Sequence, residues 1–370
     1  MTPLRIGLVT EDYYPQLGGV PEHVHHLAKE LDALGHTATI VTSRMKGKHV
    51  GEHAEVRRIG TSLVIYANGG VARLTVGWQL TARLAELFRA ERFDVVHVHG
   101  GLNPTLGIVA PWAAWRAGVP VVATFHTWFP RSVGYRVFRA PLQRMLDRHA
   151  ATVAVSRTAR DAMSRYFTAP WEIIPNGVDT TFFRPGLGRG GTRFERRNPK
   201  LLWLGRIEPR NDLGTVLAAM PQILSRFPGA QLTVVGDGPW RSRMERRARP
   251  LGAAVHFAGY ANGTRPGYYR GADVYMCSTT RASFGVTLLE AMASGTPLVV
   301  SDLPAFRDVA SHAVFAATGD PNTWARTVSA LIDDPERRAT MTHEGLRIAE
   351  QHSWPLIAER VLGVYRRVLA

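Results

Sequence analysis

The sequence predicts an α/β fold with two Rossmann-like domains that face a central cleft. Three observations lead to this prediction. The chain has 370 residues, which is more than one ordinary hydrophobic core accommodates. Short apolar segments alternate with helical patterns, which is typical of parallel sheets covered by helices. The alternation stops at 184–200, a stretch rich in glycine, proline and basic residues, and then starts again.

The first unit opens with a short, apolar and β-prone segment, as expected of a strand that is buried on both faces. A glycine-containing loop and a helical pattern ending near Gly35 follow. Strands are expected at 5–9, 37–42, 95–98 and 119–125, with helices at 24–34 and 80–90.

The second unit repeats the alternation. Its expected strands are 201–204, 231–235, 255–257, 273–276 and 297–300. A last helix, 354–370, has an apolar face that could pack on either unit. Because ligands of open parallel sheets bind at the carboxyl ends of strands, functional residues are expected in the loops that follow strands.

Composition excludes several classes of protein. With 45% hydrophobic and 20% charged residues, the chain is globular rather than disordered. We find no export signal and no apolar run near the length of a membrane span. The single cysteine, Cys277, forbids an intrachain disulfide and fits a reducing compartment. A cytoplasmic protein is expected.

The charge points to anionic partners. The formal net charge is +15, and only four of the 45 basic residues are lysines. Guanidinium groups favour phosphate-bearing ligands such as nucleotides or lipid headgroups, although arginine-rich codon usage explains the composition equally well. No nucleic-acid-binding motif is present, so nucleic acid is not an expected partner.

Several apparent motifs lack the sequence context that their chemistry requires. A G-x-G-x-x-G match at 186–191 follows no strand and opens no helix, and is interpreted as linker. No Walker loop and no D-x-D occur, which argues against a diphosphate held through a divalent ion. His23, His25 and His26 lack a metal-ligand pattern and are interpreted as surface histidines. No metal site is predicted.

Two loops of the first unit contain candidate residues. Gly19 lies between the first strand and the first helix, where a glycine lets the backbone approach an anion closely. His126 ends the strand at 119–125 and is expected to face the cleft; a buried core histidine is the alternative.

Three loops of the second unit that follow strands also contain candidate residues. Arg206 lies at the end of the first strand, where its guanidinium could bind a diphosphate. Gly236 lies in a turn after the second strand. Gly285 can open a helix, and Glu290 is about two turns inside it among apolar neighbours. A buried glutamate needs a partner, either ribose hydroxyls or an arginine.

The ordered set of motifs resembles the retaining GT-B glycosyltransferases of family 4, over nearly the whole chain. Some segments are most similar to phosphatidylinositol α-mannosyltransferases, which move mannose from GDP-mannose to an inositol lipid without a catalytic metal. The resemblance rests on these segments: Gly18–Val20, His97–His99, Thr124–His126, Val155–Ser156, Ile174–Asp179, Leu204–Arg206, Val235–Pro239 and Ser283–Pro297, and within the family Tyr66–Leu74 and Ser301–Arg307.

The resemblance implies two domains, 1–175 with the helix 354–370, and 176–353. It also implies a role for each matched residue. The catalytic residues would be His126, Arg206 and Glu290, with Glu290 on the nucleotide ribose. The donor-binding residues would be Gly19, Arg206, Arg210, Asn211, Gly236, Phe284, Gly285, Val286 and Glu290. The acceptor-binding residues would be Tyr13, Arg73 and His126, with no metal and no cofactor.

Two departures from the family pattern keep alternatives open. Ala282 replaces a second acidic residue, and Asn211 replaces a lysine near the diphosphate. The alternatives are a different donor such as UDP-glucose, a different acceptor, or a degenerate protein that binds a sugar nucleotide without transferring the sugar.

The resemblance also implies peripheral attachment to the inner face of the plasma membrane. The family's basic amphipathic helix corresponds to 80–92, which mixes arginines with glutamates. Residues 131–165 hold eight arginines against two aspartates, interleaved with apolar residues, and could rest on anionic lipid or form a solvated basic face.

Overall fold

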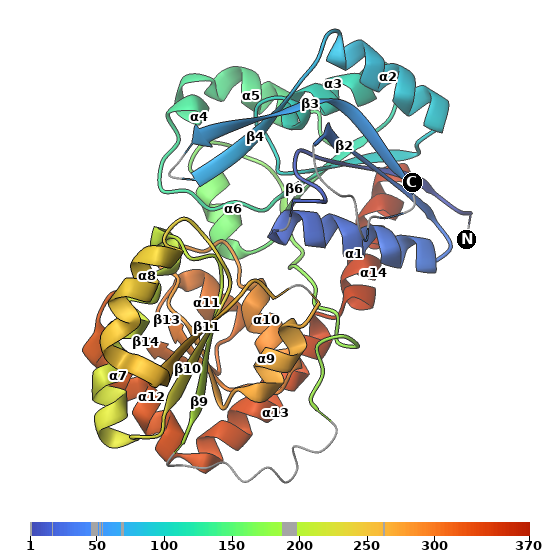
Figure 1. Ribbon diagram of the computed structural model, residues 1–370. Coiled ribbons are helices and arrows are strands. Elements are labelled where there is room, and N and C mark those ends of the chain that lie inside the picture. Colours follow the sequence, from blue (N-terminus) through green and yellow to red (C-terminus); the bar gives the residue numbers. More distant parts are fainter. Residues whose placement is uncertain are drawn as a thin grey trace. The chain divides into compact units, whose positions relative to one another are not determined.

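The structure is a computed structural model, and it describes residues 2–16, 18–45, 51, 53, 55–67, 70–186, 198–261 and 263–370. Most of the predicted linker 184–200, including most of the rejected glycine motif, lies outside these residues. The chain forms two compact units, Met1–Asn176 with Trp354–Ala370, and Gly177–Ser353. Each unit contains one sheet with helices around it (Figure 1), so the predicted fold class, two Rossmann-like α/β domains, is confirmed.

The first unit has an eight-stranded sheet in the order β4-β3-β2-β1-β5-β6-β7-β8. All neighbouring strands are parallel except β3 and β4. The strands are β1 (Arg5–Thr10), β2 (Thr37–Arg44), β3 (Val56–Ala67), β4 (Gly70–Val76), β5 (Val95–His99), β6 (Val121–Phe125), β7 (Ala151–Ala154) and β8 (Trp171–Ile173). The helices are α1 (Gly19–Ala33), α2 (Leu80–Glu91), α3 (Leu106–Arg116), α4 (Val133–Val137), α5 (Arg139–Leu146), α6 (Arg157–Ser164) and α14 (Trp354–Leu369).

Alternation along the central strands divides the core of this unit into two layers. Ile6 and Leu8 of β1 pack with α1 and α14 on one face, while Val9 packs with α2 and α3 on the other. Helix α14 lies beside α1 (Figure 1) and buries Ile357, Val361 and Tyr365 in the first layer.

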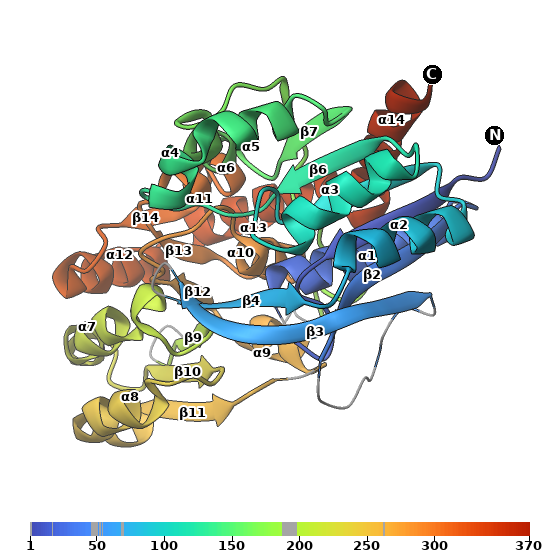
Figure 2. The same cartoon turned by 90° about the horizontal axis from the view of Figure 1, so that it is seen from above.

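The β3–β4 hairpin was not among the predicted elements, and it extends the sheet at one edge (Figure 2). A β-bulge at Gly60 divides β3 into a first part that pairs with β2 and a second part that pairs only with β4. The β2–β3 register shifts after Ser43, and Gly60 has a φ of +63°. A Cβ at Gly60 would lie 2.7 Å from the Val76 carbonyl oxygen, so only glycine fits there. The bulge lets β3 leave β2 and pair with β4.

The second unit has a six-stranded parallel sheet in the order β11-β10-β9-β12-β13-β14. The strands are β9 (Lys200–Leu204), β10 (Gln231–Val235), β11 (Val255–Gly259), β12 (Val274–Cys277), β13 (Leu298–Ser301) and β14 (Val314–Ala316). The helices are α7 (Leu213–Arg226), α8 (Arg241–Ala248), α9 (Arg265–Gly271), α10 (Val286–Ala293), α11 (Pro304–Val309), α12 (Pro321–Asp333) and α13 (Pro335–Gln351). Two short 3₁₀ turns are η1 (Pro209–Asn211) and η2 (Arg249–Ala254).

Replacing Ile357 by alanine should destabilise the first unit by about 3 kcal/mol, because a fully buried side chain leaves a cavity between α1 and α14. Urea unfolding measures the change. The matched control is Leu356→Ala on the neighbouring, exposed position, which should change the free energy of unfolding by about 0.5 kcal/mol or less. Equal effects of the two substitutions would contradict the packing described for α14.

Candidate active site

Hydrogen bonds of the Asn211 side chain fix the loop that follows β9, Gly205–Asn211. The Asn211 side chain donates from Nδ2 to the Arg206 carbonyl oxygen at 2.7 Å. Its Oδ1 accepts from the Thr279 hydroxyl at 3.2 Å. In this structure Asn211, predicted to bind the donor, shapes the backbone beneath Arg206 instead of presenting a free amide.

Two guanidinium groups of this loop share one carboxylate. Arg206 Nε lies 3.4 Å from Glu208 Oε2, and Arg210 Nε pairs with the other oxygen, Glu208 Oε1. The arginine side chains are 51% and 64% exposed, whereas that of Glu208 is 17% exposed. Such exposed pairs contribute no more than about 1 kcal/mol each. A ligand with higher negative charge, such as a diphosphate, can therefore replace Glu208 as the partner of either arginine.

Gly236 is required by packing within the chain. It has a φ of +134°, and a Cβ there would lie 2.0 Å from the Gly205 carbonyl oxygen. Two residues later, a Cβ at Gly238 would lie 2.4 Å from the Ile207 carbonyl oxygen. The loops after β9 and β10 therefore touch backbone to backbone, and a donor-binding role for Gly236 stays a prediction.

Helix α10 begins at Val286, with Gly285 as its N-cap and no side chain capping it. The first amide groups of a helix have no partner within the helix and can bind an anion. Phe284, directly before the cap, is buried. The predicted donor contacts of Phe284, Gly285 and Val286 would use this helix start.

Glu290 is 1% exposed, and both of its carboxylate oxygens have partners within the chain. Oε1 lies 2.8 Å from Arg265 Nη1, and Oε2 accepts from the Tyr269 hydroxyl at 2.8 Å. The sequence left two partners open for Glu290, ribose hydroxyls or an arginine, and in the structure the partner is an arginine. Glu290 is the fifth residue of α10, about one turn inside the helix instead of two. A ribose hydroxyl would have to share these oxygens with Arg265 and Tyr269.

Gly19 is the first residue of α1, and a Cβ there would meet no atom of the described chain within 4 Å. Packing within the described chain therefore does not explain why this residue is a glycine. Close approach of a donor diphosphate, as predicted, would explain it.

A cluster of four histidines lies at the carboxyl ends of β5 and β6 and on α1. We call His23, His97, His99 and His126 the histidine cluster; each is at most 8% exposed. His99 Nδ1 lies 3.2 Å from His126 Nε2, and His23 Nδ1 lies 2.9 Å from Asn176 Oδ1. His97 contacts the Tyr365 hydroxyl at 2.6 Å and the Thr124 hydroxyl at 2.7 Å.

This cluster corrects two predictions. His23 is 2% exposed and is therefore not a surface histidine: it lies on the buried side of α1, and its ring packs edge-on against His126 and Trp354. Asn176, predicted as the first residue of the second domain, belongs to the first unit, where its Oδ1 contacts His23 Nδ1.

Burial keeps the histidine cluster neutral. Desolvation lowers the pKa of His23 to about 4 and that of His97 to about 3, and lowers the pKa values of His99 and His126 well below the usual 6.5. Within the described chain, only His23, His99 and His126 form a group that could hold a metal ion, with one ring nitrogen each within 4.8 Å of the others. His126 can thus act as a neutral hydrogen-bonding group.

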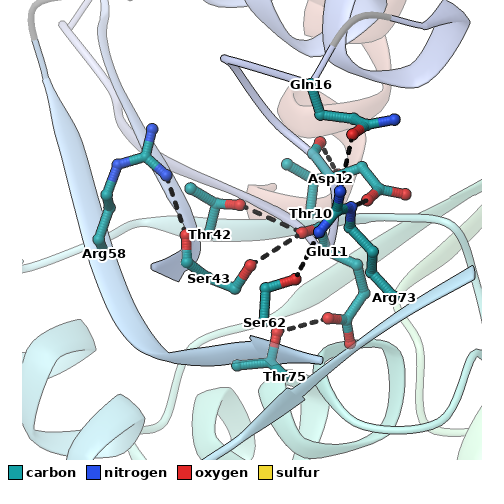
Figure 3. A network of polar contacts seen from close by, with 10 residues as sticks. All are labelled: Thr10, Glu11, Asp12, Gln16, Thr42, Ser43, Arg58, Ser62, Arg73 and Thr75. Atoms are coloured by element: carbon teal, nitrogen blue, oxygen red, sulfur yellow. Dashed lines mark hydrogen bonds and ion pairs between the residues drawn. The ribbon is translucent and has the colours of Figure 1, made fainter. Parts of the chain in front are cut away.

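A second polar network surrounds Glu11, after β1 (Figure 3). Its carboxylate accepts hydrogen bonds from Thr75 of β4, from Thr105 and from the Leu106 amide. Burial raises the pKa of Glu11, although these donors oppose the shift. The network ties the β3–β4 hairpin to β1 and to the start of α3.

Arg73, a predicted acceptor residue, belongs to the same region (Figure 3). Its Nη2 donates to Gln16 Oε1 at 2.9 Å, its Nη1 donates to Ser62 Oγ at 3.4 Å, and its Nε lies 3.6 Å from Asp12 Oδ1. The guanidinium is held in one orientation, and its side chain remains 22% exposed.

Tyr13 does not fit its predicted role. It is 0% exposed, its hydroxyl lies 3.0 Å from His25 Nδ1, and it accepts from the His53 amide at 3.1 Å. Its ring belongs to the core layer of α1 and α14. The prediction that Tyr13 binds the acceptor is therefore not supported.

Sequence and structure comparisons place these features in a known class. Residues 17–182 match the model of Glycosyltransferase Family 4, and residues 198–334 match that of Glycosyl transferases group 1. A phosphatidyl-myo-inositol mannosyltransferase of Mycolicibacterium smegmatis is 31% identical over 99% of this chain and 94% of the relative. An alpha-monoglucosyldiacylglycerol synthase of Streptococcus pneumoniae is 27% identical over 90% of this chain and 79% of the relative.

Solved structures agree on the fold. Anabaena Alr3699/HepE in complex with UDP superposes with a TM-score of 0.80 at 16% identity, covering 98% of this chain and 100% of that chain. Two Rossmann-like units with these motifs define a GT-B glycosyltransferase. The chain belongs to glycosyltransferase family 4, and among its relatives are phosphatidyl-myo-inositol mannosyltransferases.

The histidine cluster predicts a loss of stability in mild acid. The unfolded chain protonates these histidines near pH 6.5, while the folded chain does so only near pH 4 or below, so unfolding takes up protons in between. Stability is full above about pH 7 and falls as the pH drops, by roughly 1 kcal/mol per buried histidine at pH 5.5.

Urea unfolding at pH 7.5 and pH 5.5 tests this expectation. The variant His97→Gln should lose less stability between the two pH values than the unmodified chain does. The control is His256→Gln, since His256 is exposed on β11. The same pH dependence in all three proteins would show that the cluster is not neutral through burial.

Proposed function

We propose that this enzyme transfers mannose from GDP-mannose to phosphatidylinositol or a related inositol lipid, with retention at the anomeric carbon and without a catalytic metal. The observation that carries the proposal is the pair of exposed arginines, Arg206 and Arg210, held by one carboxylate after β9. Relatives at 31% identity over 99% of the chain are named phosphatidyl-myo-inositol mannosyltransferases, which supports the choice of sugar and acceptor.

In the proposed reaction the bond between the anomeric carbon and the diphosphate oxygen breaks, and its electron pair leaves with the diphosphate. An inositol hydroxyl oxygen bonds to the anomeric carbon on the same face, and its proton passes to a diphosphate oxygen. No protein nucleophile takes part. Donors that are fixed before the reaction and aimed at a developing oxyanion contribute most of such catalysis.

Each unit supplies a distinct part of this reaction. In the second unit, Arg206, Arg210 and the first amides of α10 would stabilise the leaving diphosphate, with Glu208 giving up its arginine partners. In the first unit, neutral His126 would contact the transferred sugar, and Arg73 would meet the phosphate of the acceptor lipid. Gly19 would let the backbone approach the donor.

A second candidate is transfer from UDP-glucose, or to another acceptor such as diacylglycerol. The 27% identical alpha-monoglucosyldiacylglycerol synthase and the replacement of the usual acidic residue by Ala282 favour it. A protein that binds a sugar nucleotide without transfer is the third, suggested by Ala282 and Asn211.

One assay separates these candidates. The protein is mixed with radiolabelled GDP-mannose or UDP-glucose, with and without phosphatidylinositol vesicles, and the lipid is extracted. We expect label from GDP-mannose to enter the lipid phase only when phosphatidylinositol is present. Label from UDP-glucose would favour the second candidate. Thermal stabilisation by a donor with no transfer to any acceptor would favour the third.

The substitution Arg206→Ala should lower kcat by about 10² to 10³-fold, because one preorganised donor to the leaving group is lost. The unfolding temperature should not change, since the side chain is half exposed. Arg347→Ala on α13, an exposed arginine elsewhere in the same unit, is the control and should keep full activity. Full activity of Arg206→Ala would remove Arg206 from the mechanism.

A further inference from the structure

Three members of the histidine cluster come from separate elements and meet in the interior of the first unit. His23 is on α1, His99 ends β5, and His126 directly follows β6. All three are buried. Each offers one ring nitrogen, and these three nitrogens lie within 4.8 Å of one another. The sequence gave no metal-ligand spacing here, because the fold brings the three residues together.

The spacing of the rings matches that around a tetrahedral zinc ion. With Zn–N distances of about 2.0 Å, two ligand nitrogens lie roughly 3.3 Å apart and the centres of their rings about 5 Å apart. The ring centres of His23 lie 4.7 Å from those of His126 and 5.3 Å from those of His99, and the last two are 5.5 Å apart. His99 Nδ1 lies 3.2 Å from His126 Nε2. The rings are therefore already spaced like three ligands of one ion.

His99 has binding capacity that the fold does not use. Its Nε2 is buried and has no hydrogen-bond partner within the described chain. Buried polar groups in proteins nearly always have a partner, and an exception calls for an explanation such as a bound water or ion. His97, two residues earlier on the same strand, differs: its two nitrogens contact the hydroxyls of Tyr365 and Thr124 at 2.6 and 2.7 Å.

His23 is oriented as a metal ligand usually is. Its Nδ1 lies 2.9 Å from Asn176 Oδ1, and an amide oxygen only accepts hydrogen bonds. Nδ1 therefore carries the ring proton, which leaves Nε2 bare and able to bind an ion. Ligating histidines almost always donate their other ring N–H to an oxygen in this way. Trp354 packs edge-on against the same ring and restricts its rotation.

We infer that His23, His99 and His126 form a binding site for a transition-metal dication of the zinc type. We call these residues the three-histidine site. Imidazole nitrogens suit zinc, copper, nickel and cobalt, whereas magnesium and calcium prefer oxygen ligands, which these side chains do not offer. Three protein ligands leave the fourth position to a water molecule. His126 is the most exposed of the three, so the ion would enter past its ring.

An ion in the three-histidine site would inhibit sugar transfer. This consequence rests on the proposed function, in which neutral His126 contacts the transferred sugar. An imidazole nitrogen that binds a metal ion no longer accepts a hydrogen bond from a sugar hydroxyl. A dication close to an anomeric carbon that is gaining positive charge also raises the energy of the transition state. The site is thus inhibitory and not catalytic, which is compatible with the metal-independent reaction proposed above.

The test of the site is a titration with cobalt(II). The full chain is treated with EDTA, freed of the chelator, and titrated without donor or acceptor. Tetrahedral cobalt(II) with nitrogen ligands absorbs visible light much more strongly than the hydrated ion, so the spectrum reports the site itself. We expect one tetrahedral cobalt ion per chain, displaced by zinc, which favours four-coordinate sites, but not by magnesium. Absence of the tetrahedral spectrum would overturn the inference.

Two variants on the same strand provide a matched comparison. His99→Gln should weaken cobalt binding by about a hundredfold or more, because it removes a ligand, and loss of an outer partner alone costs roughly 10- to 100-fold. His97→Gln, also buried but with both nitrogens engaged by hydroxyls, should bind cobalt like the unmodified chain. Equal losses in the two variants would contradict the assignment of the ligands.

Asn176→Ala tests the site without removing any of its ligands. It should weaken cobalt binding by about tenfold, because His23 loses the group that fixes its ring proton. Circular dichroism of the metal-free variants shows whether they fold. Unchanged cobalt binding in both Asn176→Ala and His99→Gln would overturn the inference, whatever the effect of His97→Gln.

A transfer assay separates this inference from the proposed function. Zinc should inhibit mannose transfer by the unmodified chain over the same range of concentration in which it displaces cobalt, and magnesium should not. Cobalt binding without transfer to any acceptor supports the site and contradicts the proposed function. Transfer without cobalt binding overturns the site alone. Transfer that bound zinc does not slow would contradict the inhibitory role.

Discussion

The positions of Arg206 and Arg210 depend on one carboxylate, that of Glu208. It holds both guanidinium groups at the carboxyl end of β9 while leaving their side chains half exposed or more. The arrangement keeps two cations close together at little cost in stability, because each exposed pair is weak. The backbone beneath them is rigid: Asn211 binds the Arg206 carbonyl oxygen, and the glycines after β10 allow the neighbouring loop to pack directly on it.

In the first unit, polar side chains are positioned by burial. Several of them are buried and form hydrogen bonds with residues far away in the sequence. His97 contacts Tyr365 of the last helix, and Glu11 accepts from Thr75 and Thr105. Buried polar groups satisfied in this way fix their orientation more firmly than exposed ones do. Arg73, presented by the hairpin that Glu11 anchors, is held ready in one orientation.

Much of the fold could be predicted because its signals are local. The apolar segments and helical periodicity that predicted two α/β units lie within short windows of sequence, and the family motifs lie in order along the chain. The β3–β4 hairpin also has a local signal, an Asn-Gly pair at 68 and 69 between two segments rich in β-prone residues.

The contacts of the site were harder to predict from the sequence, because they join residues that are far apart along the chain. His23 is on the same face of α1 as Leu27 and Leu31, which indicates burial, but its partner Asn176 is 153 residues away. Glu290 was expected to need a partner, and nothing in the local sequence identified Arg265 and Tyr269. Tyr13 was assigned to the acceptor by resemblance, while its buried contacts with His25 and His53 became apparent only in three dimensions.

We propose that arginines and backbone amides, not a metal ion, receive the negative charge of the departing diphosphate. The most direct measurement is the initial rate of mannose transfer in excess EDTA, followed by addition of magnesium, manganese or zinc. We predict the same rate with and without the chelator. A rate that EDTA abolishes and an added cation restores would contradict the claim, and would make His23, His99 and His126 the first candidates for the ion's ligands.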